Sequence, residues 1–141
     1  MNVEIIITKI QIDICIEYEI SKMKVRCKTL ENNTAKELLK LMPFKSTLYK
    51  LGEGEEFYFD APKNDIKEEK SAIKVFNLGE IAFWKQGNAI TINYGKKTTN
   101  LNNEIRLISP ANLWAKACNP TELLKLDDFD SEDQIIIRKI D

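Results

Sequence analysis

The sequence contains no histidine among its 141 residues. This absence removes Ser-His-Asp and Cys-His nucleophilic catalysis, histidine metal sites, and the side chain best suited to proton transfer near neutral pH. Only three cysteines occur, Cys15, Cys27 and Cys118. They lack the CxxC spacing of zinc sites, which indicates reduced, partly buried thiols. We therefore expect no catalytic residues of these kinds, no metal site and no cofactor.

The chain also lacks an excess of charge of either sign and lacks long hydrophobic runs. It carries 21 Lys and Arg against 22 Asp and Glu, a formal net charge of -1. No general field therefore draws it to nucleic-acid phosphates or anionic lipid. Its apolar runs are far shorter than the roughly 20 residues of a spanning helix. The first residues, 1–4, do not have the pattern of a signal peptide. We expect a cytoplasmic protein with no nucleic-acid or membrane partner.

Regular alternation of apolar and polar residues is the strongest pattern that is present. Between Ile10 and Ile20, isoleucines and Tyr18 occupy every second position, while Gln11, Glu17 and Glu19 lie between them. A period of two predicts a half-buried strand. Residues 3–7 form either a preceding strand or the start of the same long one. Similar runs predict strands at residues 23–27, 44–51, 55–59, 81–84, 89–94, 105–108, 113–117 and 134–140.

Two short helices are predicted between these strands. Thr34 and Glu37 have the spacing of a capping box, an apolar stripe follows through Met42, and Pro43 ends the helix. Asn119 and the proline after it predict a second short helix at 121–126. Residues 60–74 are charged and contain a proline, which predicts an exposed excursion.

The predicted order of elements limits the fold class. About eight or nine strands with two short helices, without a regular strand–helix repeat, favour an antiparallel barrel or sandwich. No internal repeat or linker divides the chain, so we expect one domain over residues 1–141. Its length is sufficient for a buried core without disulfides or metal.

Three weaker motifs favour structural interpretations. The acidic segment 127–133 resembles the start of a calcium loop, but it has Asp133 in place of the required glycine and Lys139 in place of the closing glutamate. The segment "LGEGEEF" lacks the phosphate-binding spacings GxGxxG and GK[ST]. Glu55 and Glu56 lie on opposite faces of a strand, which argues against a catalytic carboxylate pair.

An ordered set of segments resembles a known family. The segments are "LYKLGEGEEFYFDAP", "NLGEIAFWKQGNAITINYG" and "SPANLWAKA", following a helix near 34–42. They resemble the cyclophilin-like family of small prokaryotic and archaeal proteins, whose prototype came from a thermophilic bacterium. Leu51 stands where that family usually has tryptophan, and Glu80 where it has aspartate. The resemblance implies a mostly β fold, a closed antiparallel eight-stranded barrel with two short capping helices.

The same resemblance raises the question of prolyl isomerase activity. In true isomerases of this fold, an arginine on one strand polarises the proline amide, with aromatic, glutamine and histidine groups around it. The corresponding strand here, 44–50, offers only Lys45 and Lys50, and lysine lacks the planar geometry of a guanidinium. Amide rotation needs no nucleophile, so a divergent peptidyl-prolyl cis-trans isomerase remains an alternative.

The expectation that we carry forward is a non-catalytic barrel that binds a small molecule or an extended peptide in a surface groove. Aromatic walls with a few polar groups are typical of such grooves. The residues that we expect to line it are Tyr49, Glu56, Tyr58, Trp84, Asn93 and Asn112. A self-associating structural module, a homo-oligomer paired through strand edges or groove aromatics, is a further alternative.

Overall fold

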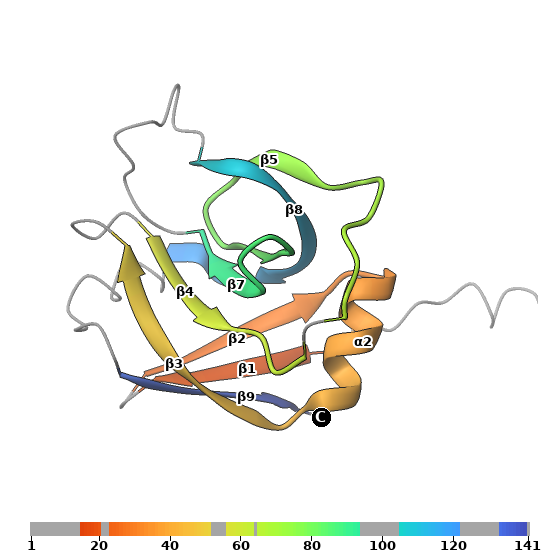
Figure 1. The fold of residues 1–141 in the computed structure, drawn as a ribbon. Coiled ribbons are helices and arrows are strands. Elements are labelled where there is room, and N and C mark those ends of the chain that lie inside the picture. The colour runs from red at the N-terminus through yellow and green to blue at the C-terminus, as the bar shows by residue number, and fades with distance from the viewer. Residues whose placement is uncertain are drawn as a thin grey trace, which may run out of the picture.

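The computed structural model describes residues 15–20, 23–51, 56–63, 65–93, 105–121 and 133–140. Within these ranges, it describes only the backbone of residues 50, 51, 56, 105, 106 and 108. Four predicted features fall mainly outside these residues: the strand at 3–7, the glycine turn before Glu56, the helix at 121–126 and the acidic segment before Asp133. The elements, labelled as in Figure 1, are β1 (Cys15–Ile20), β2 (Met23–Thr29), α2 (Asn33–Leu41), β3 (Phe44–Leu51), β4 (Glu56–Asp60), β5 (Ile73–Phe76), β6 (Glu80–Trp84), β7 (Ala89–Ile92), β8 (Ile105–Ala117) and β9 (Gln134–Lys139).

Eight of the strands form a closed antiparallel barrel. Their order around it is β2-β1-β9-β3-β4-β7-β6-β8, and pairing of β2 with β8 closes the circle. Strand β5 pairs with β8 outside this circle. The predicted mostly β, closed eight-stranded barrel is therefore confirmed, and the described residues contain one helix of more than one turn, α2. Among the described residues, no helix has the length and apolar character needed to cross a bilayer.

The barrel interior is filled by the apolar residues of the alternating strands. Ile16, Tyr18 and Ile20 of β1 are at most 1% exposed, as the period-two pattern predicted. The Tyr18 ring meets the Phe59 ring edge to face, with the centroids 6.0 Å apart. Other strands contribute buried side chains to the same cluster, among them Val25, Leu48, Phe57, Ile81, Phe83, Ile90, Ile92, Trp114, Ile135 and Ile137.

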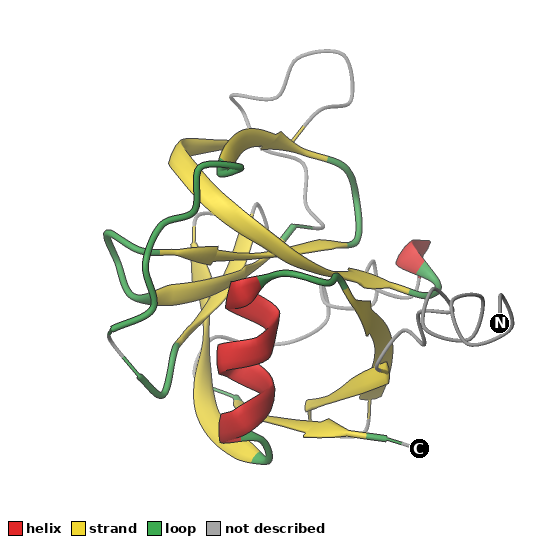
Figure 2. Cartoon of the chain, turned by 90° about the vertical axis from the view of Figure 1, so that its right-hand side faces the viewer, coloured by secondary structure: helices red, strands yellow, loops and turns green. Residues whose placement is uncertain are grey.

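Helix α2 lies across one end of the barrel (Figure 2) and buries Ala35, Leu38 and Leu39 there. Its N-cap is Asn32, whose side-chain oxygen accepts a hydrogen bond from the Ala35 N–H at 2.9 Å. The predicted capping box of Thr34 and Glu37 is therefore wrong. The Thr34 hydroxyl is buried and donates to Glu69 instead, so it is not free to cap the helix.

Strand β8 is longer than predicted, and its partner β5 was missed. The predicted strands 105–108 and 113–117 are one continuous strand that runs through Pro110. Ile73 pairs with Ala111 while Val75 pairs with Arg106, so a bulge in β8 accommodates the proline, which cannot donate a ladder hydrogen bond. Strand β5 has only four residues, too few for alternation to identify it within a charged segment.

A second, smaller apolar cluster lies outside the barrel. Phe76, Leu107 and Ala111 of β5 and β8 pack against Ala82 of β6, and the half-buried Leu78, Trp84 and Leu113 border them. Figure 1 shows β5 and the first half of β8 arching away from the other strands. The segment 60–74 is also less exposed than predicted, because Ala61 and Ile66 are buried in the main core.

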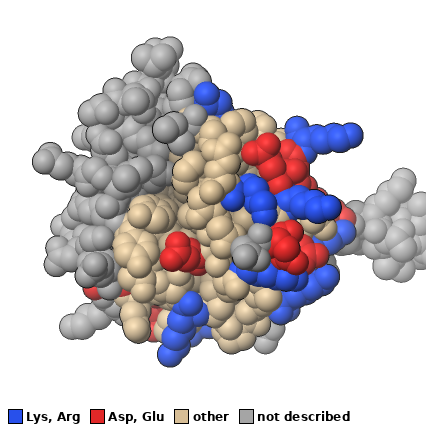
Figure 3. Space-filling view, viewed as in Figure 1, with Lys and Arg blue, Asp and Glu red and all other residues tan. Residues whose placement is uncertain are grey.

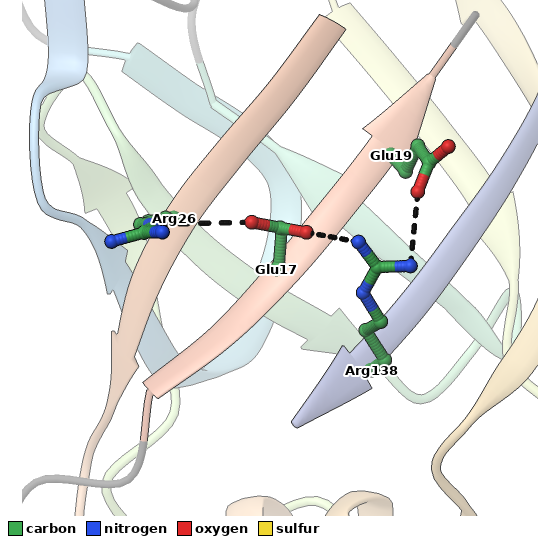
Figure 4. Close-up of polar contacts among 4 residues, drawn as sticks. All are labelled: Glu17, Glu19, Arg26 and Arg138. Carbon is green, nitrogen blue, oxygen red and sulfur yellow. Dashed lines mark hydrogen bonds and ion pairs between the residues drawn. The ribbon is translucent and has the colours of Figure 1, made fainter. Parts of the chain in front are cut away.

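Charged side chains of both signs share the outer surface (Figure 3). On β1, Glu17 lies in register with Arg26 of β2 and Arg138 of β9. Its carboxylate accepts a hydrogen bond from Arg138 and lies 3.7 Å from the Arg26 Nε, while Arg138 also contacts Glu19 at 3.0 Å (Figure 4). These pairs neutralise the carboxylate of Glu17, which is only 4% exposed.

The Tyr18 hydroxyl gives a testable pH dependence. It is buried with no hydrogen-bond partner among the described residues, and burial, with a smaller contribution from Cys27, raises the pKa of Tyr18 well above 10.0. Above pH 10 the unfolded tyrosine loses its proton while the folded one keeps it, so the free energy of unfolding should fall as pH rises. Tyr18→Phe should flatten this fall and change stability at pH 7 by no more than about 1 kcal/mol.

Urea unfolding of both proteins between pH 7 and 11 measures this difference. An equally steep alkaline loss in the Tyr18→Phe variant would show that other groups cause it.

Candidate ligand-binding surface

The outer face of four neighbouring strands brings together part of the predicted site. Backbone register places Tyr49 of β3 opposite Tyr58 of β4, Tyr58 opposite Thr91 of β7, and Thr91 opposite Ala82 of β6. Because side chains alternate across a strand, and the neighbours Leu48, Phe57, Phe59, Ile90 and Ile92 fill the interior, this row lies on the outside of the barrel.

Tyr49 and Tyr58 form the central feature of this row. Their rings stack with centroids 5.3 Å apart and planes inclined by 30°. Both side chains are half-buried. Cross-strand aromatic pairs hold each other in place, so the two rings present a preformed flat surface.

Polar groups of β7 lie next to the tyrosines. Thr91 is 4% exposed, and its hydroxyl has no hydrogen-bond partner among the described residues. Asn93 follows β7 and is fully buried; its side-chain amide donates to the Glu80 carbonyl at 2.9 Å, while its Oδ1 has no described partner. Asn93 thus fixes the start of β6 and leaves one buried acceptor unused.

Trp84 lies apart from the tyrosine pair, at the border of the second apolar cluster. Its indole N–H donates to the Ser109 hydroxyl, which in turn donates to Gln86 at 3.1 Å. A Cβ added at Gly87 would approach the Trp84 ring to 2.4 Å, so the turn after β6 requires a glycine there. The half-buried Trp84 anchors β6 to β8.

Asn112 connects three segments instead of lining a groove. Its Oδ1 accepts from the Glu69 N–H at 2.8 Å, and its amide donates to the Thr34 hydroxyl at 2.9 Å and the Lys67 carbonyl at 2.8 Å. It is 1% exposed and joins β8, α2 and the segment before β5. Of Glu56, the last predicted residue, the structure describes the backbone at the start of β4, opposite Leu51.

A surface hollow lies elsewhere, at the seam between β2 and β8. It has a volume of about 340 Å³ and is lined by Lys28, Thr29, Leu30, Lys116, Ala117 and Cys118. None of the predicted site residues lines it. Thr91 and this hollow were both missed, although the alternation "KVRCKT" does predict that Lys24, Arg26 and Lys28 share the outer face of β2.

Two further expectations from the sequence concern a catalytic cation and a metal site. Lys45 of β3, one of the two cations considered for proline-amide polarisation, is exposed opposite Ile136 and does not line the hollow. In the part of the chain that the structure describes, no three Cys, Asp or Glu side chains gather in a way that could hold a metal ion.

We expect Asn112→Ala to lower the free energy of unfolding by about 2 to 3 kcal/mol, because it removes a buried hydrogen bond to the Thr34 hydroxyl and two part-buried ones, to the Glu69 N–H and the Lys67 carbonyl. Asn112→Asp serves as the matched variant: it keeps the oxygen that accepts from the Glu69 N–H but loses both donors. The part of the stability loss that comes from the Glu69 N–H should therefore be smaller in this variant. Urea unfolding measures both changes, and a loss below 0.5 kcal/mol (about half of one typical hydrogen bond) for Asn112→Ala contradicts the structural role.

Comparisons with known proteins agree with this architecture. A profile of the family described as cyclophilin-like matches residues 10–138. The solution structure of a hypothetical protein from Archaeoglobus fulgidus has a TM-score of 0.74 with this chain at 20% sequence identity, covering 94% of this chain and 98% of that one. No curated protein matches the sequence. The structural likeness shows a shared fold, and because the profile match spans most of the sequence, this chain belongs to the cyclophilin-like family.

Proposed function

We propose that the protein is a non-catalytic binding module that holds a small molecule or an extended peptide against the outer face of β3, β4 and β7. The observation that carries this proposal is the stacked, half-buried pair Tyr49 and Tyr58 beside Thr91, whose buried hydroxyl has no described partner. A flat apolar surface next to an unused polar group is typical of a ligand contact.

The free-energy cost of an unpaired hydroxyl and the low entropy cost of ordering the tyrosines both favour a binding role for this surface over a purely structural one. A buried hydroxyl without a partner costs about 1 to 3 kcal/mol, and a polar ligand atom that reached Thr91 would recover part of that cost. The tyrosines lose little side-chain entropy on binding because each already packs on the other. In this proposal Trp84, Asn93 and Asn112 position the strands.

A binding screen tests the proposal. The probes are short peptides with a central aromatic or proline residue and a set of aromatic amides, added to ¹⁵N-labelled protein. We expect saturable amide shifts at residues 57–60 and 89–93, and we expect Tyr49→Ala with Tyr58→Ala to weaken binding by about tenfold or more, since aromatic anchors dominate such contacts.

The matched control is Lys45→Ala, an exposed residue on the same strand. Equal affinity of the double tyrosine variant and this control would contradict the proposal. Shifts that grow with protein concentration, checked by sedimentation, would instead favour self-association.

The proposal also predicts that the protein does not accelerate prolyl isomerisation. Exchange NMR on Xaa-Pro peptides, with an authentic cyclophilin as the positive control, measures the rate. We expect no acceleration at high protein concentration, because the corresponding strand, 44–50, has lysines and no arginine, and Lys45 on it is exposed. Acceleration lost in the Lys45→Gln variant would establish the divergent isomerase instead.

A further inference from the structure

The hollow between β2 and β8 has a firmly held backbone frame. Cys27, Lys28 and Thr29 of β2 pair in register with Ala117, Lys116 and Ala115 of β8. Beyond these pairs, the Leu30 N–H donates to the Trp114 carbonyl at 2.8 Å, and the Cys118 N–H donates to the Arg26 carbonyl at 2.9 Å. Hydrogen bonds at both ends hold the backbone from which the lining side chains extend.

The cations of β2 lie opposite carboxylates at two positions and not at the third. Lys24 lies opposite Glu19 of β1, and Arg26 opposite Glu17. Lys28, the next residue on this face, lies opposite Cys15 on one side and Lys116 on the other. Like charges directly opposite on neighbouring strands destabilise a sheet, so this pair carries an electrostatic cost.

Among the described residues, one carboxylate reduces that cost. The Lys116 Nζ lies 3.6 Å from an oxygen of Glu80, which is 8% exposed. Lys28 is exposed and has no ion-pair partner among the described residues. The two cations and one carboxylate leave an excess of positive charge at the hollow, although the whole chain has a net charge of -1.

We propose that this hollow is a binding site for a small anion, with Lys28 and Lys116 contacting a phosphate or carboxylate group. The volume of about 340 Å³ lies at the small end of the range for ligand pockets. Leu30 and Ala117 supply an apolar contact for the rest of the ligand. This site is separate from the tyrosine surface, so either proposal can fail without the other.

Titration of ¹⁵N-labelled protein with inorganic phosphate and, separately, with succinate at constant ionic strength tests the site, with chloride as the reference anion. We expect saturable amide shifts confined to residues 28–30 and 116–118. Lys28→Gln should weaken binding by about fivefold, the effect of one partly exposed ion pair. The tighter of the two anions identifies the chemical group.

Glu80→Gln separates ligand binding from a structural role. It removes the charge that competes for Lys116 but keeps the oxygen that accepts from the Asn77 N–H. We therefore expect phosphate or succinate to bind more tightly, by a few-fold, whereas Lys74→Gln on β5, an exposed lysine outside the hollow, should leave affinity unchanged. Shifts that do not saturate, or equal weakening by Lys28→Gln and Lys74→Gln, overturn the proposal.

Discussion

Closure of the barrel depends on one short pairing, that of β2 with β8. The three residue pairs from Cys27–Ala117 to Thr29–Ala115 join the first and last strands of the eight. Without them, β2 and β8 would each leave a free strand edge. This pairing requires β8 to turn from β5 to β6 and β2 along its 13 residues, which the bulges at Pro110 and between Ile81 and Ala82 allow. Closure also brings Lys28 against Lys116, so the same contact that completes the fold places two like charges opposite each other.

Asn112 holds the end of the barrel for a related reason. It lies on β8 opposite Phe83 of β6, close to the register shift between Ile81 and Ala82, and its three hydrogen bonds fix the segment before β5 and the start of α2 at that point. Glu69, held by Asn112, accepts from the Thr34 N–H at the positive end of the helix dipole. One polar network therefore sets both the position of α2 and the direction of β8. This role explains why Asn112, which the sequence suggested as a groove amide, is buried instead.

Sequence patterns predicted the barrel well because alternation is a local property. Ile16, Tyr18 and Ile20 repeat every second residue, and this repeat alone determines which face is buried. The pattern could not predict β5, because its four residues are stabilised by pairing with the distant β8. It could not predict the true N-cap either, because Thr34 bonds with Glu69, which lies 35 residues later in the sequence. For the candidate site, adjacency of Tyr49 and Tyr58 follows from the β3–β4 hairpin register, whereas Thr91 joins them only through the pairing of β4 with β7.

The polar and charged groups that could contact a partner lie mainly on the outer face of this barrel, because apolar side chains fill its interior. The surfaces described above are spaced around that face: the Glu17 ion pairs across β9, β1 and β2, the tyrosines across β3 and β4, and the lysine hollow between β2 and β8. In the first, every carboxylate meets a cation, which stabilises the sheet and leaves no charge for a ligand. In the other two, a polar or charged group remains without a described partner at a fixed position. Such groups cost stability in the free protein, and a bound partner is the simplest way in which that cost is recovered.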